Sequence, residues 1–298
     1  MSKVFIIGLV FIYSLTLSAQ KGDEVEATNH RAIDEKVVEL NRLGDSLLNA
    51  LKFKDRLIAD TSFIKLFSRT LRMPSAYTYN FDTLIFIKQL KSNDGKFRLF
   101  TWALAFPNST YRYRGVMMLP SGEYNGECKL LPFNDAGESL DSASRHTGIL
   151  QRNKWVGCLY YDIISHRVKD KTYYTLLGWD GYRAISHRRI IEVISFNESR
   201  DIDFGADIFL VGNKTMNRVV FEYNAEASMV LNYIPNLKVI SFDHLVPPES
   251  TKDGTPPLFT YVPDGTYDYF QLKKGKWIFM DGEFFEKNKG KIIKEAGK

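Results

Sequence analysis

The sequence predicts a mainly β protein, an antiparallel meander that forms a sandwich or a strongly curved sheet, preceded by a short N-terminal α-helical segment. Apolar residues recur every three or four positions up to about residue 75, and every second position from about residue 77 almost to the end. Clusters of Gly, Pro, Asn and Asp separate the alternating runs. Hydrophobic residues make up 44% of the chain, which excludes a wholly disordered protein.

Residues 1–20 have the three parts of a secretory signal peptide. Lys3 supplies a positive charge, residues 4–17 are mostly apolar, and Leu17-Ser18-Ala19-Gln20 offers small residues for cleavage. The apolar run is shorter than the roughly 20 residues that a membrane span needs. We therefore expect an exported protein, periplasmic or extracellular, without a transmembrane span in the mature chain.

The two cysteines and the charge bear on the chemistry that such a protein can have. An exported chain permits a disulfide between Cys128 and Cys158, and two buried thiols are the equal alternative. The formal net charge of +5 is too small to indicate nucleic-acid binding, so we expect no nucleic-acid partner. The most basic segment is the tail at residues 286–298, for which we expect a solvated, frayed end.

Residues 21–75 carry the helical pattern. Gly44 interrupts a stripe of apolar residues that recur at helical spacing, Ile33, Val37, Leu40, Leu47 and Leu51. A second helical pattern runs over residues 57–71, with Asp60 or Thr61 as its expected cap and Pro74 as its stop. The two patterns predict either a helical hairpin or one broken helix.

Residues 76–285 read as one antiparallel β domain. Strands are expected wherever apolar and polar residues alternate between turn signals. The expected strands cover 84–90, 97–106, 111–119, 127–131, 155–165, 172–179, 189–196, 207–211, 217–223, 229–234, 237–242, 267–272 and 276–280.

The clearest hairpin signal lies in residues 171–196. Two strand patterns flank an Asp-Gly pair, which commonly forms tight turns. The segment up to Ile185 is too long for a two-residue turn, so we expect a wider loop. That loop would carry Trp179, Asp180 and Tyr182.

Three expected loops hold the candidate functional residues. The first is the loop just described, the second is Asp243-His244, and the third is the segment 264–268. If the loops meet, they combine carboxylates, a histidine and exposed aromatic rings, which are typical of glycan-binding or glycan-cleaving sites. The alternative is that Asp-Gly only marks turns and that the aromatic residues belong to the core. The candidate binding residues are Trp179, Asp180, Tyr182, His244, Asp264 and Asp268.

Familiar catalytic and cofactor motifs are absent from the sequence. Ser62-Phe-Ile-Lys65 matches a penicillin-interacting pattern, but it lies on an expected helix without companion motifs. The acidic segment 198–207 has no calcium-loop spacing, and no Cys-His spacing indicates zinc. We expect neither a metal nor a cofactor.

Four short segments resemble uncharacterised exported proteins of Bacteroidetes-type bacteria. They are Leu17-Ser18-Ala19-Gln20, Leu177-Gly178-Trp179-Asp180-Gly181, Phe242-Asp243-His244-Leu245 and Tyr261-Val262-Pro263-Asp264-Gly265. The resemblance implies an envelope or extracellular setting, and it implies no activity.

These observations lead to three functional hypotheses. The first is a secreted or periplasmic, non-enzymatic β protein that binds a partner protein or a glycan in the cell envelope. The second is an envelope-glycan hydrolase that uses Asp180, Asp243 or Asp264 as acid or base, with His244 assisting. The third is a structural envelope subunit, which would expose an apolar patch for assembly.

Overall fold

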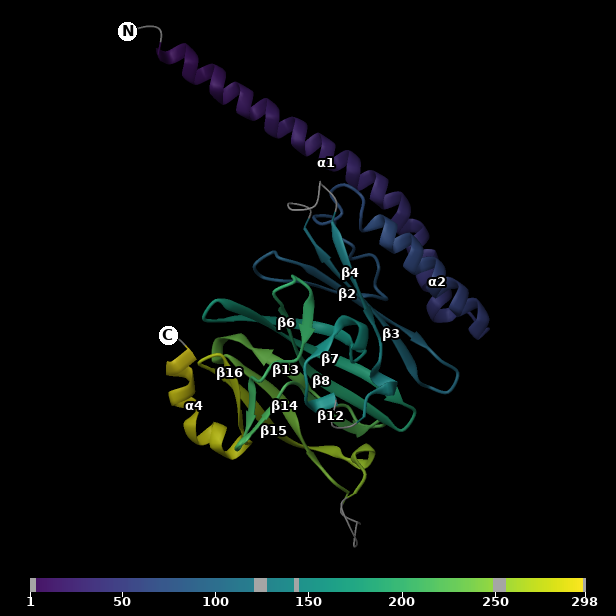
Figure 1. The fold of residues 1–298 in the computed structure, drawn as a ribbon, viewed down its shortest axis with the longest axis vertical. Helices are drawn as coiled ribbons and strands as arrows, with labels where there is room; N and C mark the ends of the chain where they lie inside the picture. The colour runs from purple at the N-terminus through teal and green to yellow at the C-terminus, as the bar shows by residue number, and fades with distance from the viewer. Residues whose placement is uncertain (1–3, 121–127, 142–144, 249–255, 297–298) are drawn as a thin grey trace. The chain divides into compact units, whose positions relative to one another are not determined.

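The structure, a computed structural model, describes residues 4–120, 128–141, 145–248 and 256–296. Strands make up 43% of it and helices 28%, so the mainly β class predicted from the sequence is confirmed. Two helices precede the strands, as expected, and another helix follows them (Figure 1). In the residues described, no helix is long and apolar enough to cross a membrane.

The first of two compact units, Met1–Ile85 with Met118–Leu130, contains helices α1 (Val4–Asn49) and α2 (Phe53–Thr70). The helices pack against each other, so they form the hairpin rather than the single broken helix. The apolar stripe of α1 is buried at four of its five expected positions, Ile33, Val37, Leu40 and Leu47.

Two details of this hairpin differ from the sequence prediction. Leu51 is 99% exposed, because it lies in the connection between the helices instead of on the apolar stripe. Helix α2 begins at Phe53, so neither Asp60 nor Thr61 caps it. Asp60 instead lies buried inside the helix.

Aromatic rings fill the space beside α2. Phe63 and Phe67 stack with ring centres 5.1 Å apart, and Phe67 meets Phe81 edge to face at 5.7 Å. The Tyr79 hydroxyl donates a hydrogen bond to Asp34 of α1 at 2.6 Å. Burial of these rings stabilises a helix pair that would be marginal in isolation.

The second unit, Phe86–Met117 with Leu131–Lys298, contains two six-stranded sheets. In the first sheet the order is β5-β9-β8-β7-β6, and β12 also pairs with β8. Its strands are β5 (Leu150–Gln151), β6 (Leu159–Val168), β7 (Lys171–Arg183), β8 (Ser186–Phe196), β9 (Ile202–Phe204) and β12 (Val219–Asn224). In the second sheet the order is β11-β10-β16-β15-β14-β13. Its strands are β10 (Phe209–Val211), β11 (Lys214–Met216), β13 (Leu231–Ile234), β14 (Val239–Val246), β15 (Val262–Lys273) and β16 (Lys276–Met280).

Pairing within these two sheets is antiparallel except between β10 and β16, which run in parallel. A four-stranded sheet has the order β1-β2-β3-β4, with strands β1 (Lys88–Lys91), β2 (Arg98–Ala105), β3 (Tyr111–Leu119) and β4 (Lys129–Asn134). Short 3-10 helices interrupt the chain at η2 (Gly137–Ser139), η3 (Arg152–Lys154), η4 (Pro235–Leu237) and η5 (Leu258–Thr260).

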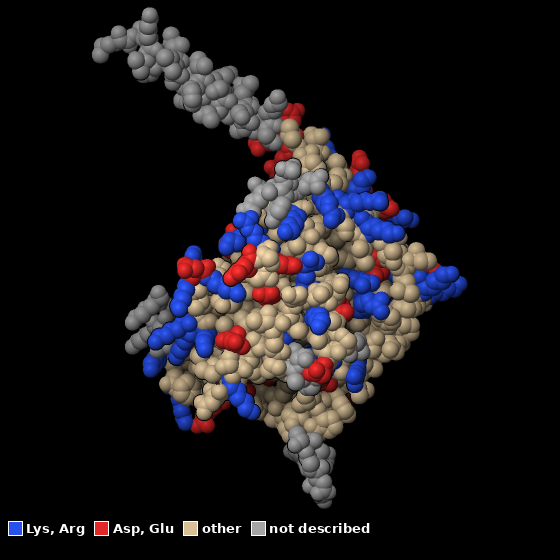
Figure 2. All heavy atoms as spheres, in the orientation of Figure 1, with Lys and Arg blue, Asp and Glu red and all other residues tan. Residues whose placement is uncertain are grey.

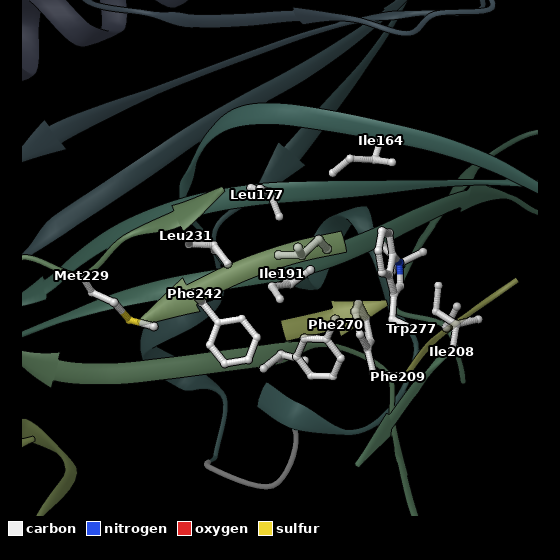
Figure 3. Close-up of a cluster of buried hydrophobic side chains, with 14 of the residues drawn as sticks. Ile164, Leu177, Ile191, Ile208, Phe209, Met229, Leu231, Phe242, Phe270 and Trp277 are labelled. Atoms are coloured by element: carbon white, nitrogen blue, oxygen red, sulfur yellow. The ribbon is translucent and has the colours of Figure 1, made fainter. Parts of the chain in front are cut away.

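Apolar side chains from both six-stranded sheets form one core, shown in Figure 3. The sheet of β6, β7 and β8 contributes residues such as Ile164, Leu177 and Ile191, and the sheet of β14, β15 and β16 contributes Phe242, Phe270 and Trp277. The Trp277 indole also donates to the Thr175 hydroxyl at 2.9 Å, which links β16 to β7. The two sheets therefore pack as a sandwich, one of the two predicted arrangements.

The hairpin of β7 and β8 corrects the expectation of a wide loop. Strand β7 continues to Arg183 and β8 begins at Ser186, so the turn has only two residues. The register slips between Asp180 and Arg183, where two residues of β7 face one of β8. This β-bulge keeps the Asp-Gly pair inside the strand, and the pair does not form the turn. Trp179, Asp180 and Tyr182 are therefore strand residues.

The end of the chain also differs from expectation. Residues 282–296 form helix α4 (Gly282–Ala296), where the sequence predicted a frayed basic tail from residue 286. The Phe285 ring stacks on Tyr269 of β15, with ring centres 3.7 Å apart, and Ile292 is buried in the same cluster. Phe285 and Ile292 lie seven positions apart, so they share one face of α4, and burial of this apolar face stabilises the helix.

A buried ion pair supports the sheet of β8. Neither Arg218 nor Glu192 is exposed, and the Arg218 Nε donates to Glu192 at 2.8 Å. The same guanidinium donates to the backbone carbonyls of Phe204, Arg145 and Gly148. Such a charge is tolerated inside a protein when its donors have partners.

We predict that Arg218→Ala lowers the free energy of unfolding by about 3–5 kcal/mol, because it leaves Glu192 as a buried carboxylate without its cation. Urea unfolding checks this. Arg152→Ala is the matched control: its pair with Asp201 leaves both side chains 37% exposed, so it should cost less than about 1 kcal/mol. Similar losses for the two variants would contradict the prediction.

Candidate functional site

Four residues from the second and third predicted loops meet at one pocket of the second unit. His244, Asp264, Tyr267 and Asp268 line a cavity of about 680 Å³ that also borders the start of α4. This volume lies within the 300–1,000 Å³ typical of sites for small ligands. His244 and residues 264–268 therefore lie together, but on the paired strands β14 and β15 and not in the loops that the sequence predicted.

An irregularity in the pairing of β14 with β15 brings these side chains together. Asp243 faces Tyr267 and Leu245 faces Pro263, so His244 alone stands opposite the three residues 264–266. Gly265 has φ +87°, a backbone conformation that favours glycine. The extra residues of β15 form a bulge, and the Asp264 and Thr266 side chains line the same pocket as His244.

His244 and Asp268 form a hydrogen-bonded pair at the pocket. The His244 Nδ1 lies 2.7 Å from an Asp268 carboxylate oxygen, and the imidazole side chain is 45% exposed. The hydrogen bond to Asp268 raises the pKa of His244 above its ordinary value. The other Asp268 oxygen accepts the Gly282 N–H at 3.2 Å, so this carboxylate also holds the start of α4.

Asp264 supplies an ionised carboxylate at the pocket rim. Its Oδ1 accepts hydrogen bonds from the backbone N–H and the hydroxyl of Thr266, at 2.8 and 2.7 Å. These two bonds lower the pKa of Asp264. Asp281, Glu283 and Glu286 add further carboxylates to the lining, against Lys287, which pairs with Glu283. The pocket is therefore acidic on a basic protein.

The start of α4 is fixed in place by local interactions. Asp281 caps the helix, because its Oδ1 accepts the Phe284 N–H at 2.7 Å. Gly282 lies so close to the Tyr267 carbonyl oxygen that a Cβ would have no room. Tyr267 itself is 43% exposed and offers its ring to a ligand.

The first predicted loop does not contribute an exposed binding surface. Asp180 is 6% exposed and Tyr182 is 8% exposed, where the sequence predicted accessible loop side chains. The Asp180 Oδ1 accepts the Tyr182 N–H at 2.8 Å, and Arg188 lies 3.7 Å from the other Asp180 oxygen. Burial raises the pKa of Asp180 to about 6.

The remaining aromatic side chains of this region pack against protein. The Arg188 guanidinium lies over the Tyr182 ring, 3.0 Å from its centre. Trp179 is half-buried and meets the rings of Tyr111 and His187 edge to face. The Tyr111 ring also leaves no room for a side chain at Gly181, which explains the glycine there.

Asp243, the further candidate acid or base, is 7% exposed. Its Oδ2 accepts the Val230 N–H at 2.7 Å, and its own N–H donates to the Val230 carbonyl. Both interactions tie β14 to the residue before β13. Asp243 therefore has a structural role in the sandwich, while its neighbour His244 faces the pocket.

Sequence reasoning missed Asp281, Glu283 and Glu286, because they fall at the end of the last expected strand and in the expected tail. The signal that could have found them is the capping pattern Asp281-Gly282-Glu283, which follows strand β16 and precedes apolar residues at helical spacing. A helix begun there places its first-turn carboxylates at the sheet edge.

The acidic segment and the cysteines lie elsewhere. Asp201 pairs with Arg152, and Asp207 accepts a hydrogen bond from Asn217. Within the described ranges, no group of three or more His, Cys, Asp or Glu residues could hold a metal ion. Cys128 and Cys158 are both buried and no disulfide joins them in the structure, which agrees with the alternative of two buried thiols.

Comparison of the chain with protein-family models, with curated proteins and with solved structures found no match. The function is therefore inferred from the chemistry of the pocket.

We predict that the pKa of His244, followed by NMR through its ring protons, lies above the ordinary value of 6.5. Asp268→Asn should lower this pKa, because the substitution removes the carboxylate that holds the charged imidazole. Asp170→Asn, at an exposed position outside the pocket lining, is the control and should leave it unchanged. An unchanged His244 pKa in Asp268→Asn would show that the pair does not form in solution.

A second prediction concerns stability and Asp180. Its pKa is 3.8 ordinarily and about 6 in the fold. The folded chain thus binds this proton more tightly, so the stabilisation is complete below pH 3.8 and is lost as the pH rises through 6. At about 1.4 kcal/mol per pKa unit, the loss is on the order of 3 kcal/mol.

Asp180→Asn should therefore flatten the dependence of unfolding free energy on pH between these two values, measured by urea unfolding at several pH values. Asp170→Asn again serves as the exposed control. An equal slope in the wild-type protein and in Asp180→Asn would contradict the raised pKa.

Proposed function

We propose that this chain is a non-enzymatic protein of the cell envelope that binds a glycan in the pocket of His244, Asp264, Tyr267 and Asp268. The observation that carries the proposal is the convergence of these four side chains at one open cavity. They come from two paired strands, one of which, β15, bulges opposite His244, which is a local departure from regular pairing.

The chemistry of the lining favours a ligand that donates hydrogen bonds. Carboxylates only accept hydrogen bonds when ionised, and Asp264 is held ionised by Thr266. Sugar hydroxyl groups and sugar amines are such donors, and an exposed tyrosine ring offers an apolar face for a sugar ring. The negative lining disfavours glycans that carry phosphate or carboxylate groups at this pocket.

Export supports an envelope setting. The pattern of residues 1–20 is typical of a secretory signal peptide, and the resemblance to exported proteins of Bacteroidetes-type bacteria implies the same compartment. Glycans are abundant there, so the proposed ligand and the proposed compartment agree. Analysis of the N-terminus of the protein from its native cells tests export, because cleavage after Ala19 or Gln20 is expected.

One observation favours a second candidate, a glycan hydrolase. An imidazole held by a carboxylate at 2.7 Å is an arrangement in which histidine can transfer protons. In that case Asp268 orients His244, and the imidazole, whose side chain is 45% exposed, acts as acid or base. Asp180 and Asp243, which the hydrolase hypothesis also considered, are buried and bonded to other groups.

Isothermal titration with a glucosamine oligomer and a neutral glucose oligomer tests the proposal. We predict that the amine-bearing oligomer binds, and that Asp264→Asn and Tyr267→Ala each weaken binding roughly tenfold, by removing a charge-assisted hydrogen bond or the ring face. Asp170→Asn is the charge-matched control and should bind as the wild-type protein does.

Two results would contradict the proposal. Equal losses in Asp264→Asn and Asp170→Asn would place the ligand outside this pocket. Shorter oligomers appearing by mass spectrometry, and disappearing in His244→Asn, would replace the binding function with hydrolysis.

A further inference from the structure

A second pocket in the same unit is lined largely by lysine. Its cavity of about 730 Å³ lies at the turn between β15 and β16 and at the start of β14. Lys238, Lys273, Lys274 and Lys276 line it together with Leu272 and Ile278. No acidic residue belongs to this lining. The pocket thus has the opposite charge from the pocket of His244.

The lysines occupy positions where local structure disfavours them. Lys273 and Lys276 face each other directly across the hairpin, and like charges at such positions destabilise a strand pair. Lys274 has φ +48° and Gly275 φ +79°, so the two-residue turn needs two left-handed residues. Asn-Gly suits this turn best, and a lysine there costs stability. Residues that break local rules commonly mark a functional site.

The neighbouring hairpin adds more positive charge. Gly275 packs so tightly on Val168 that a Cβ would overlap its side chain, so the β6–β7 turn touches the β15–β16 turn. That turn carries Arg167, Lys169 and Lys171, all exposed, with Asp170 as the acidic residue among them. Lys and Arg atoms gather at this edge of the second unit in Figure 2, where Figure 1 draws the two turns.

The pocket floor contains a polar group that a ligand could satisfy. Gln271 is 2% exposed, and its Oε1 has no hydrogen-bond partner within the described residues. An unpaired buried amide oxygen costs stability. A ligand that combines negative groups with hydroxyl donors matches the lysines and this oxygen together.

We propose that this pocket binds an anionic glycan. The carboxylate or phosphate groups of the glycan pair with Lys238, Lys273, Lys274 and Lys276, and its hydroxyl groups donate hydrogen bonds to the Gln271 Oε1. Lysine is a flexible point charge, which suits charges spaced along a polymer. The concave shape favours a chain that enters the cavity over a flat membrane surface. This site is separate from the pocket of His244 and does not depend on the function proposed for it.

The test compares Lys273→Gln/Lys274→Asn/Lys276→Gln with a control of equal charge change, Lys36→Gln/Lys54→Gln/Lys65→Gln, whose lysines are exposed on α1 and α2. The pocket variant should fold, because it removes a like-charge pair and restores the preferred turn sequence. Thermal unfolding of both variants checks this.

The probes are an oligouronate, a phosphorylated mannan oligosaccharide, and vesicles of phosphatidylcholine with and without phosphatidylglycerol. We expect at least one of the two glycans to bind, with roughly tenfold weaker binding in the pocket variant and little change in the control. Added salt should weaken binding in the wild-type protein.

Three results would overturn the proposal. In the first, neither glycan binds, so the pocket has no such ligand. Equal losses of affinity in both variants count against it as well, because net charge alone would then account for binding. In the second, only vesicles with phosphatidylglycerol bind, so that the surface meets a membrane. In the third, sedimentation shows salt-sensitive self-association that the pocket variant abolishes, so that the lysines meet the acidic pocket of another copy.

Discussion

The buried cation of Arg218 is the constraint on which the sandwich most depends. Its guanidinium reaches Glu192 on β8 and three backbone carbonyls, at Arg145, Gly148 and Phe204. The first two carbonyls belong to the segment before β5, and the third belongs to β9, which pairs with both β8 and β5. A single side chain therefore adds hydrogen bonds to backbone carbonyls before β5 and in β9, and it ties both segments to the central strand β8.

A second polar cluster lies near the other end of β8. Arg188 binds Glu222 through two nitrogens, approaches Asp180 and covers the Tyr182 ring. Polar groups inside a low-dielectric core restrict their partners to one arrangement, because a slipped strand would leave them unpaired. The two clusters thus specify the register of β8 against β7 and β12. Apolar contacts alone would tolerate a shift of this register more easily.

Much of the fold could be predicted from the sequence, because apolar spacing reports the local period directly. The stripe at Ile33, Val37, Leu40 and Leu47 is buried as expected, and the alternation later in the chain marks strands, although the first strand begins only at Lys88. Local turn chemistry was misleading at Asp180-Gly181. There the glycine accommodates the Tyr111 ring, a residue about 70 positions away in the sequence, so no local rule could reveal it.

The candidate site was predictable only in part for the same reason. Asp264-Gly265 and His244 were expected in loops, whereas they lie in β15 and β14, and their meeting depends on a bulge that strand patterns do not disclose. The carboxylates of α4 were missed because the lysines of that segment suggested a solvated tail. Its apolar residues Phe285 and Ile292 decide the outcome, since they bury against β15 while the lysines stay in water.

The charge of this protein is segregated in a way that its composition conceals. A net charge of +5 over 298 residues suggests a weakly basic surface, yet one pocket gathers five carboxylates and another gathers four lysines. Both pockets lie on the sheet of β14 and β15, whose bulge exposes one and whose final turn exposes the other. Each cluster raises electrostatic repulsion within the fold. Their placement at two ends of one sheet agrees with the proposed binding of two ligands of different charge.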